Sequence, residues 1–221
     1  IVGHDTTSLN ILGNIDNQDR VHGFVNTNGT ITGRMTHREP NLAQVPNSNS
    51  PYGKECRACW TVPKDYKLVG IDASGLELRM LAHYMNDKEF TNEILHGDIH
   101  SSNQKIAGLE SRGQAKTFIY AFIYGAGDEK LGTVVKGGRR DGQRLKQRFL
   151  DNLPSLRNLK NRVTRASSKG FIKGLDGRKI YIRSTHSALN ALLQGGGSIV
   201  MKEALHLLNG YIIDNNLDAH F

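Results

Sequence analysis

Apolar and polar positions along the first third of the chain predict short strands joined by loops. The segment "VHGFVNTNGTITGRMT" alternates apolar and polar residues around Asn28 and Gly29. An Asn-Gly pair between two such runs predicts a hairpin of two short strands. Residues 40–63 are punctuated by proline and predict an extended loop. The run "YKLVGID" then predicts a compact apolar strand that ends at Asp72.

The pattern changes to helical spacing after this strand. A helix is predicted from Ser74 to about Met85. Ser74 with Glu77 three residues later predicts a capping box, in which the glutamate bonds back to the backbone N–H of the cap. Several helices joined by glycines are expected between Thr91 and Phe149. This region indicates a helical subdomain inserted into the fold.

The remaining sequence returns to strands and then to a helix. The segment "GFIKGLDGRKIYIR" predicts two strands around a turn at Asp176 and Gly177, and a helix is expected to begin near Ser184 or Thr185. The order of strand, helical insertion, hairpin and helix predicts an α+β fold whose sheet is built from both ends of the chain.

Composition places the chain among packed globular proteins, because 38% of its 221 residues are hydrophobic. Nowhere do about 18 uncharged apolar residues follow one another, and the first residues lack the order of a secretory signal. We therefore expect a soluble intracellular protein. Since the chain begins with Ile1 rather than Met, we also expect it to be a piece of a longer protein.

Charge narrows the range of partners. The formal net charge is +8, and twelve Lys or Arg residues lie between Lys136 and Lys173, against only Asp141 and Asp151. Such a cluster suits a polyanion such as nucleic acid, and a solvated helical surface explains the cluster equally well.

The two cysteines, Cys56 and Cys59, have a C-x-x-C spacing. A zinc ribbon needs a second such pair, which the sequence lacks, and a thioredoxin-like site needs a helix that follows a strand. We interpret the spacing as coincidental.

The segment "RGQAKTFIYAFIYGAGDEK" is the most informative one. Two cations and two aromatic residues follow one another at steps of four residues: Arg112, Lys116, Tyr120 and Tyr124. Each step turns a helix by only about 40 degrees, so these side chains share one face. Phe118, Ile119 and Phe122 point away from that face and are expected to anchor the helix to the rest of the subdomain. Gly125 and Gly127 are expected to end the helix. Cations at one end and aromatic rings at the other suit the phosphates and the flat base of a nucleotide. The alternative is a surface helix on which these four residues share a face by chance.

Two further positions are candidates for phosphate chemistry. His100, in "HGDIHSSNQ", lies near a predicted helix start, where backbone N–H groups favour anions, although single histidines commonly have no such role. Asp72 ends a strand, where its carboxylate is a natural ligand for Mg²⁺. Phosphoryl transfer commonly uses two such ions about 3.5 to 4 Å apart, and one aspartate cannot hold both. The alternative roles of Asp72 and Glu77 are in helix capping.

The last predicted helix carries Asn190 and Gln194 one turn apart, followed by "GGG" at 195–197. Each glycine in a helix costs about 1 kcal/mol relative to alanine, so three together require a reason. Two amides beside small residues are able to read the minor-groove edge of a duplex, and a tight helix crossing explains the glycines equally well.

Taken together, these motifs resemble those of the family A DNA polymerases, typified by bacterial polymerase I, and most closely those of the replicative polymerases of podoviruses. The resemblance runs from about Gly23 to Leu208. "GRMTHREPNLAQVPNSNSPYGKECRACW" resembles the segment that leads into the palm, and "IDASGLELRMLAHY" the first catalytic palm motif. "GDIHSSNQ" and "RGQAKTFIYAFIYGAGDEK" resemble the nucleotide-binding fingers, and "LDGRKIYIRSTHSALNALLQGGGSIVMK" the returning palm.

The resemblance implies a right-hand polymerase palm sheet with an inserted helical fingers subdomain. Four regions are implied in order: the end of the thumb or lead-in at 1–25, the first part of the palm at 26–90, the fingers at 91–168 and the second part of the palm at 169–221. The family's second palm carboxylate lies in a His-Asp-Glu turn, expected to begin at about His220 and Phe221. The fragment itself is therefore expected to be nearly inactive.

The resemblance also implies roles at the catalytic centre. Asp72, with the carbonyl of Ala73, corresponds to the metal-binding position for Mg²⁺, two ions being expected in the complete enzyme. Glu77 matches the residue that blocks a ribose 2'-OH. The triphosphate grip corresponds to His100, Arg112 and Lys116, with Lys116 also helping pyrophosphate to leave. Tyr120 matches the position under the nucleotide sugar, and Tyr124 the one that stacks in the template-base position.

Contacts to the primer-template are implied at five positions: Arg34, Gln44, Arg178, Asn190 and Gln194. Ala121 departs from the family pattern, because close relatives often have glycine there. The implied activity is template-directed DNA synthesis from dNTPs in viral DNA replication, in the cytoplasm of an infected bacterial host and without a membrane partner. A host processivity factor is a candidate partner through the thumb.

Two alternatives stay open at this point. A single-subunit RNA polymerase shares the palm and a similar fingers helix, but that family has a small residue at the position of Glu77. A non-catalytic basic nucleic-acid-binding module is the alternative outside the enzyme class, and it predicts salt-sensitive DNA binding without nucleotide incorporation.

Overall fold

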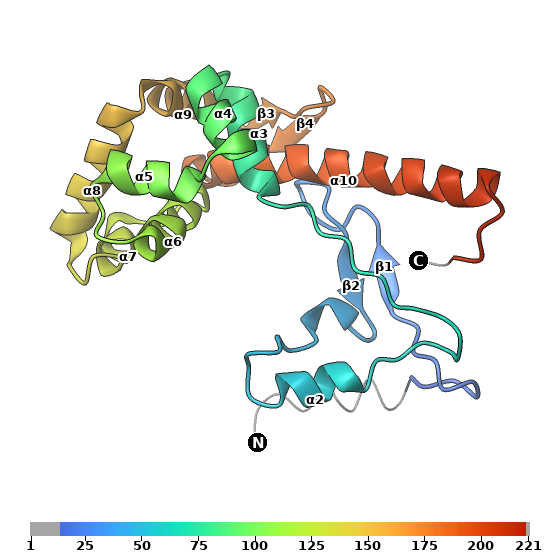
Figure 1. The fold of residues 1–221 in the computed structure, drawn as a ribbon. Coiled ribbons are helices and arrows are strands. Elements are labelled where there is room, and N and C mark those ends of the chain that lie inside the picture. Colours follow the sequence, from blue (N-terminus) through green and yellow to red (C-terminus); the bar gives the residue numbers. More distant parts are fainter. Residues whose placement is uncertain (1–13, 220–221) are drawn as a thin grey trace. The chain divides into compact units, whose positions relative to one another are not determined.

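The computed structural model describes residues 14–219, which form parts of two compact units, Ile1–Ser74 and Gly75–Phe221 (Figure 1). Much of the predicted thumb or lead-in segment, residues 1–13, lies outside the described residues, as do His220 and Phe221, where the second palm motif is expected to begin.

The first unit contains the predicted hairpin. Strand β1 (Phe24–Asn26) pairs antiparallel with β2 (Thr36–Arg38), which confirms two short strands. The connection spans residues 27–35 and is longer than the two-residue turn that an Asn-Gly pair favours. Gly29 is required by a close approach, because a Cβ atom there would lie 2.0 Å from the hydroxyl oxygen of Thr36.

The predicted loop at 40–63 is more structured than expected. It contains a short 3₁₀ helix, η1 (Leu42–Gln44), which Asn41 caps, and a helix, α2 (Gly53–Ala58). Cys56 lies in α2 and Cys59 follows it, and both are free thiols. The thiol of Cys59 donates to the backbone oxygen of Glu55 at 3.3 Å, as a helical side chain at this spacing can.

The predicted strand "YKLVGID" is not a strand in the described residues. An extended segment becomes a strand by pairing with a neighbouring backbone, and no described segment pairs with residues 66–72. Its apolar side chains are consequently exposed, with Leu68, Val69 and Ile71 about three-quarters accessible at 76%, 74% and 75%.

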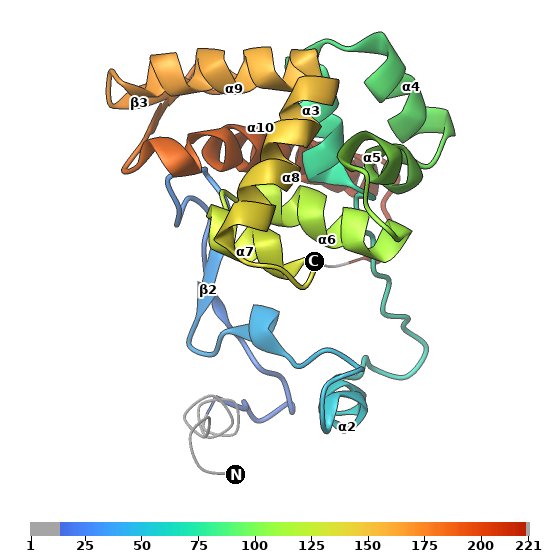
Figure 2. The ribbon, with the colours of Figure 1, turned by 90° about the vertical axis from the view of Figure 1, so that its left-hand side faces the viewer.

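The second unit is mainly helical, as predicted for 91–149, and ends with the predicted hairpin and helix (Figure 2). Its helices are α3 (Leu76–Met85), α4 (Lys88–His96), α5 (Ile99–Ala107), α6 (Arg112–Ile123), α7 (Asp128–Thr133), α8 (Arg139–Asn152), α9 (Pro154–Ser167) and α10 (Ala188–Asp214). Strands β3 (Phe171–Lys173) and β4 (Lys179–Tyr181) pair antiparallel, and the short 3₁₀ helix η2 (Thr185–Ser187) precedes α10.

Side-chain caps start several of these helices where the sequence supplies them. Asp87 caps α4, Asp98 caps α5, and Ser111 with Gln114 forms a capping box at α6. The capping box predicted for Ser74 and Glu77 is wrong. Helix α3 begins at Leu76, its cap is Gly75 with a φ of 60°, and no side chain caps it.

An aromatic cluster joins α6 to α8 in the core of this unit. The ring of Phe149 lies edge-on to those of Phe118 and Phe122, with centroid distances of 5.1 and 5.7 Å. Phe149, Phe118 and Ile119 are fully buried. The prediction that Phe118, Ile119 and Phe122 anchor α6 is therefore confirmed.

The glycine run of α10 serves a tight helix crossing. A Cβ atom on Gly196 would lie 2.8 Å from the sulfur of Met80 and 3.3 Å from the hydroxyl oxygen of Tyr84, both on α3. A Cβ atom on Gly197 would lie 3.2 Å from a methyl carbon of Leu76. Helix α10 continues through the three glycines, and the close approach of α3 accounts for Gly196 and Gly197.

The α+β class is confirmed, with a correction to the sheet. Among residues 14–219 the strands form two separate two-stranded sheets, β1 with β2 and β3 with β4, rather than one sheet built from both ends of the chain. Each pair is joined by a short connection, so both sheets form locally.

Candidate nucleotide-binding site

One face of α6 displays the predicted stripe. Arg112, Lys116 and Tyr124 are exposed and Tyr120 is half-buried, while Phe118 on the opposite face is fully buried. The rings of Tyr120 and Tyr124 are stacked, with centroids 6.4 Å apart and planes 24° apart. Helix α6 therefore presents two cations and a pair of parallel rings on one surface.

Asp98 joins the start of α5 to Arg112 on α6. Its carboxylate accepts from Nε of Arg112 at 2.6 Å and from Nη2 at 3.1 Å. It also accepts from the backbone N–H of His100 at 3.1 Å. These bonds place His100 beside the cationic end of α6.

The environment of this cluster shifts three pKa values. The guanidinium of Arg112 holds the pKa of the Asp98 carboxyl well below its usual range, and in turn Asp98 raises the pKa of Arg112. Burial lowers the pKa of His100, and the charges of Arg112 and Lys116 lower it further against the opposing effect of Asp98. The imidazole is therefore neutral near pH 7, and its Nδ1 is buried without a hydrogen-bond partner among the described residues.

Glu77 on α3 approaches the other end of the stripe. Its carboxylate accepts a hydrogen bond from the hydroxyl of Tyr124 at 3.3 Å. Burial raises the pKa of Tyr120, and the negative charge of Glu77 raises it further. Since α3, α5 and α6 all lie in the second unit, their packing brings together groups that are distant in the sequence.

A continuous series of contacts links these residues. Arg112 is paired with Asp98, and Asp98 bonds His100. The rings of His100 and Tyr120 lie 6.1 Å apart. Tyr120 stacks on Tyr124, which bonds Glu77. Asp98 was missed by the sequence prediction, although an aspartate directly before a helix is a recognisable cap signal.

The other predicted residues lie elsewhere in the two units. Arg178, in the turn between β3 and β4, is paired with Asp176 at 3.1 Å. Asn190 and Gln194 are half-buried on α10, the first one turn before the second. Arg34 and Gln44 are exposed in the first unit, where the hydroxyl of Thr30 bonds the backbone of Arg34.

Asp72 is exposed and Ala73 half-buried, both in the first unit. A carboxylate and a carbonyl are hard oxygen donors, and Mg²⁺ is commonly bound by one or two carboxylates together with substrate phosphates. In the described part of the chain no three His, Cys, Asp or Glu side chains gather closely enough to hold a metal ion. Asp72 and Ala73 therefore supply two oxygen donors, but no complete set of metal ligands gathers among the described residues.

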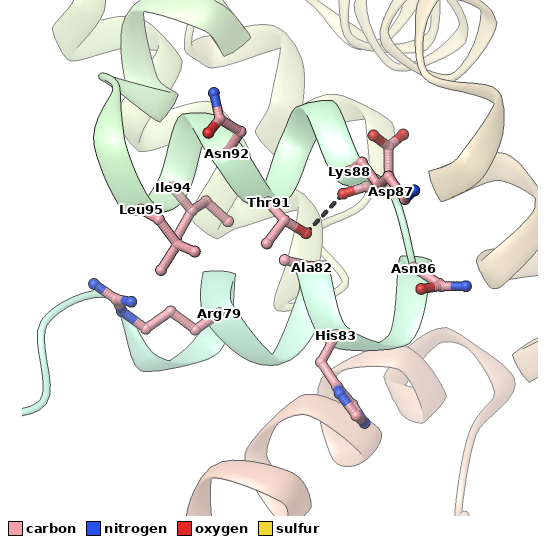
Figure 3. Close-up of a pocket in the computed structure, with 10 residues that line it drawn as sticks. All are labelled: Arg79, Ala82, His83, Asn86, Asp87, Lys88, Thr91, Asn92, Ile94 and Leu95. Atoms are coloured by element: carbon pink, nitrogen blue, oxygen red, sulfur yellow. Dashed lines mark hydrogen bonds between the residues drawn. The ribbon is translucent and has the colours of Figure 1, made fainter.

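A groove of about 520 Å³ runs between α3 and α4 (Figure 3). Arg79, His83 and Lys88 give it a basic lining, and the hydroxyl of Thr91 donates to the backbone oxygen of Asp87 at 2.6 Å within it. None of the predicted site residues lines this groove. Among residues 14–219, no helix has both the length and the apolar character to cross a membrane.

Comparison with solved structures first defines the class. The fold matches that of a polymerase domain, described as the POL domain of Pol1 from M. smegmatis in complex with DNA primer-template and dNTP. The TM-score is 0.84 over 96% of this chain and 41% of the other, at 24% sequence identity. A family model, DNA polymerase family A, matches residues 4–221, and the chain belongs to that family.

Curated relatives agree with this assignment. The chain is 46% identical over 209 residues to the DNA-directed DNA polymerases of Enterobacteria phage T3 and Escherichia phage T7. Each match covers 83% of this chain and 30% of the relative, so the chain spans about a third of the length of these relatives. A DNA polymerase I from Pseudomonas aeruginosa is 26% identical over 223 residues. The family resemblance is confirmed.

Proposed function

We propose that the complete protein containing this chain is a template-directed DNA polymerase, which adds dNTPs to a primer 3'-OH in viral DNA replication. The observation that carries the proposal is the contact series from Arg112 to Glu77 in a member of family A. It offers cations at one end, aromatic rings in the middle and a carboxylate at the other end. These are the features expected of a site for a triphosphate, a base and a sugar.

The cationic end binds the triphosphate. Arg112 and Lys116 supply positive charge one helical turn apart, and His100, kept neutral by its surroundings, supplies a ring N–H. Phosphoryl transfer depends mainly on positioning and on stabilising the charge of the phosphate oxygens. Lys116 is also assigned the role of assisting the departure of pyrophosphate, because its exposed ammonium supplies positive charge on this face.

The aromatic end selects the sugar and positions the base. Tyr120 lies under the nucleotide sugar, and Glu77 blocks a ribose 2'-OH. The Tyr124 bond holds the Glu77 carboxylate on α3 next to α6. The ring of Tyr124 stacks in the template-base position. These assignments favour dNTPs over NTPs.

Asp72 and the carbonyl of Ala73 would hold Mg²⁺, with a further carboxylate from the complete protein. When bound, Mg²⁺ ions neutralise phosphate charge and favour the nucleophilic form of the primer hydroxyl. Primer-template contacts are assigned to five residues: Arg34, Gln44, Arg178, Asn190 and Gln194. The same proposal assigns residues 26–90 to the first part of the palm, 91–168 to the fingers and 169–221 to the second part of the palm. It also includes a host processivity factor as partner and the host cytoplasm as location.

Primer extension by the complete gene product tests the proposal. The wild type is expected to extend a primer with dNTPs and Mg²⁺. Asp72→Asn should lower the rate by about 100-fold or more, because metal stabilisation is worth several kcal/mol. Lys116→Ala should lower it by about 100-fold, the lower range for a group that assists proton transfer. Asp65→Asn and Lys105→Ala, both at exposed positions, are matched controls that should extend like the wild type.

Two results would overturn the proposal. Robust extension with NTPs would identify an RNA polymerase instead. A protein that binds DNA in a salt-sensitive way, but neither incorporates dNTPs nor responds to Asp72→Asn and Lys116→Ala, would be a non-catalytic binding module.

A further inference from the structure

Four hydrogen bonds converge on the carboxylate of Asp98. Oδ1 accepts from the backbone N–H of His100 and from Nη2 of Arg112, each at 3.1 Å. Oδ2 accepts from the hydroxyl of Ser101 at 2.8 Å and from Nε of Arg112 at 2.6 Å. Two of the four donors come from the first turn of α5 and two from the first residue of α6. One half-buried residue therefore ties the starts of two helices together.

The geometry of the pair leaves Arg112 able to bind a second anion. A guanidinium has five N–H donors in a rigid planar fork. Asp98 occupies one side of that fork, through Nε and Nη2, so the end of the fork that includes Nη1 is not used by this pair. The side chain of Arg112 is 56% exposed, which leaves that end accessible.

The same carboxylate also fixes His100. Asp98 is the cap of α5 and bonds the backbone N–H of His100, the second residue of that helix. His100 and Arg112 are thus held by one group, although they belong to different helices. A plain helix cap would need only the α5 bonds. The neighbouring cap Asp87 shows this, because it bonds Phe90 of its own helix and Ser155 and has no arginine partner among residues 14–219.

We propose that Asp98 is a positioning residue for triphosphate binding, and that it acts through Arg112 by fixing the guanidinium side-on with its free end toward the phosphate. This inference rests on the proposed nucleotide site. Fixing an arginine before the ligand arrives reduces the ordering cost of binding. A bidentate pair restricts the guanidinium more than a single hydrogen bond does.

A double-mutant cycle with inorganic triphosphate as the probe tests this role. Calorimetric titration of the 221-residue protein compares the wild type with Asp98→Asn, Arg112→Lys and the double variant. Asparagine keeps the cap, because it caps helices about as well as aspartate, but it cannot accept both guanidinium bonds. Asp98→Asn is expected to weaken binding by about tenfold, the lower range for residues that orient a ligating group. In the Arg112→Lys background, where no fork remains to be held, it should have no further effect.

Asp87→Asn is the matched control, since it changes the cap of the adjacent helix α4 without touching Arg112. It should bind triphosphate like the wild type. Equal binding by Asp98→Asn and the wild type would overturn the proposal, as would effects of Asp98→Asn and Arg112→Lys that simply add. A wild type that binds no triphosphate would overturn it as well.

Primer extension by the complete protein separates this proposal from the proposed function. If Asp98 positions the triphosphate, Asp98→Asn raises KM for dNTPs by about the same tenfold factor while the melting temperature stays near that of Asp87→Asn. A complete protein that extends no primer would refute the polymerase function, while the triphosphate titrations would still decide the role of Asp98.

Discussion

The hydroxyl of Tyr124 donates a hydrogen bond to the carboxylate of Glu77 across 3.3 Å, although the two residues are 47 positions apart. Tyr124 is the C-cap of α6, and Glu77 lies in the first turn of α3. The bond holds a charged side chain beside the stacked rings of Tyr120 and Tyr124. Glu77 is therefore engaged with the face of α6 and not with the backbone of its own helix.

Glu77→Ala in the complete protein is expected to reduce discrimination against ribonucleotides. Removing the side chain opens the space that a 2'-OH would occupy, and the ratio of kcat/KM for dNTP to that for NTP should fall by about tenfold or more, equivalent to about 1.4 kcal/mol. Tyr124→Phe removes the hydroxyl that bonds Glu77 and should change the ratio in the same direction by a smaller factor. An unchanged ratio in Glu77→Ala would exclude the sugar-selecting role.

His100 is expected to make stability depend on pH below neutrality. Its pKa is lower in the folded protein than the ordinary value of 6.5, so the unfolded chain binds a proton more readily. The stabilising contribution is complete above about pH 6.5 and is lost as the pH falls toward the lower folded pKa. The charges that face it are Arg112, Lys116 and Asp98.

Urea unfolding measured at several values between about pH 7.5 and pH 5 checks this expectation. The wild type should lose more stability over that range than His100→Gln, which has no ionisable ring. Parallel curves for the two proteins would show that His100 does not titrate differently in the folded state.

Phe149→Ala is expected to destabilise the second unit strongly. The ring is fully buried and packs edge-on against Phe118 and Phe122, which anchor α6. Loss of a buried phenylalanine typically costs about 3–5 kcal/mol. Urea unfolding of the variant measures the change, and Phe149→Leu should lose clearly less. A cost below about 1 kcal/mol for the alanine variant would contradict the packing described for α8 against α6.

Two glycines of α10 should respond in opposite directions. Gly210→Ala is expected to raise the free energy of unfolding by about 1 kcal/mol, because alanine favours the helix and a Cβ atom there meets nothing within 4 Å. Gly196→Val is expected to lower it by about 1–3 kcal/mol, since the added atoms overpack against Met80 and Tyr84. Stabilisation by both substitutions would show that α10 and α3 do not cross closely.

Features that depend on near neighbours in the chain were predictable. The helical face of Arg112, Lys116 and Tyr120 follows from a spacing of four residues, and the turn at Asp176 follows from two adjacent residues. The family was recognisable for the same reason, because its motifs are short and local. The role of Asp98 as the cap of α5 was also predictable from the sequence. Its bond to Arg112 was not, because the two residues are 14 positions apart.

The sequence by itself determined the two hairpins, the helical character of residues 91–149 and which side chains α6 presents on one face. Only the tertiary structure decided that Glu77 bonds Tyr124 instead of capping α3, and that Gly196 allows α3 and α10 to cross closely. It also decided that residues 66–72 stay unpaired in the described chain. The physical reason is range: helix spacing and caps act within about four residues. Strand pairing and contacts between helices depend instead on segments that only folding brings together.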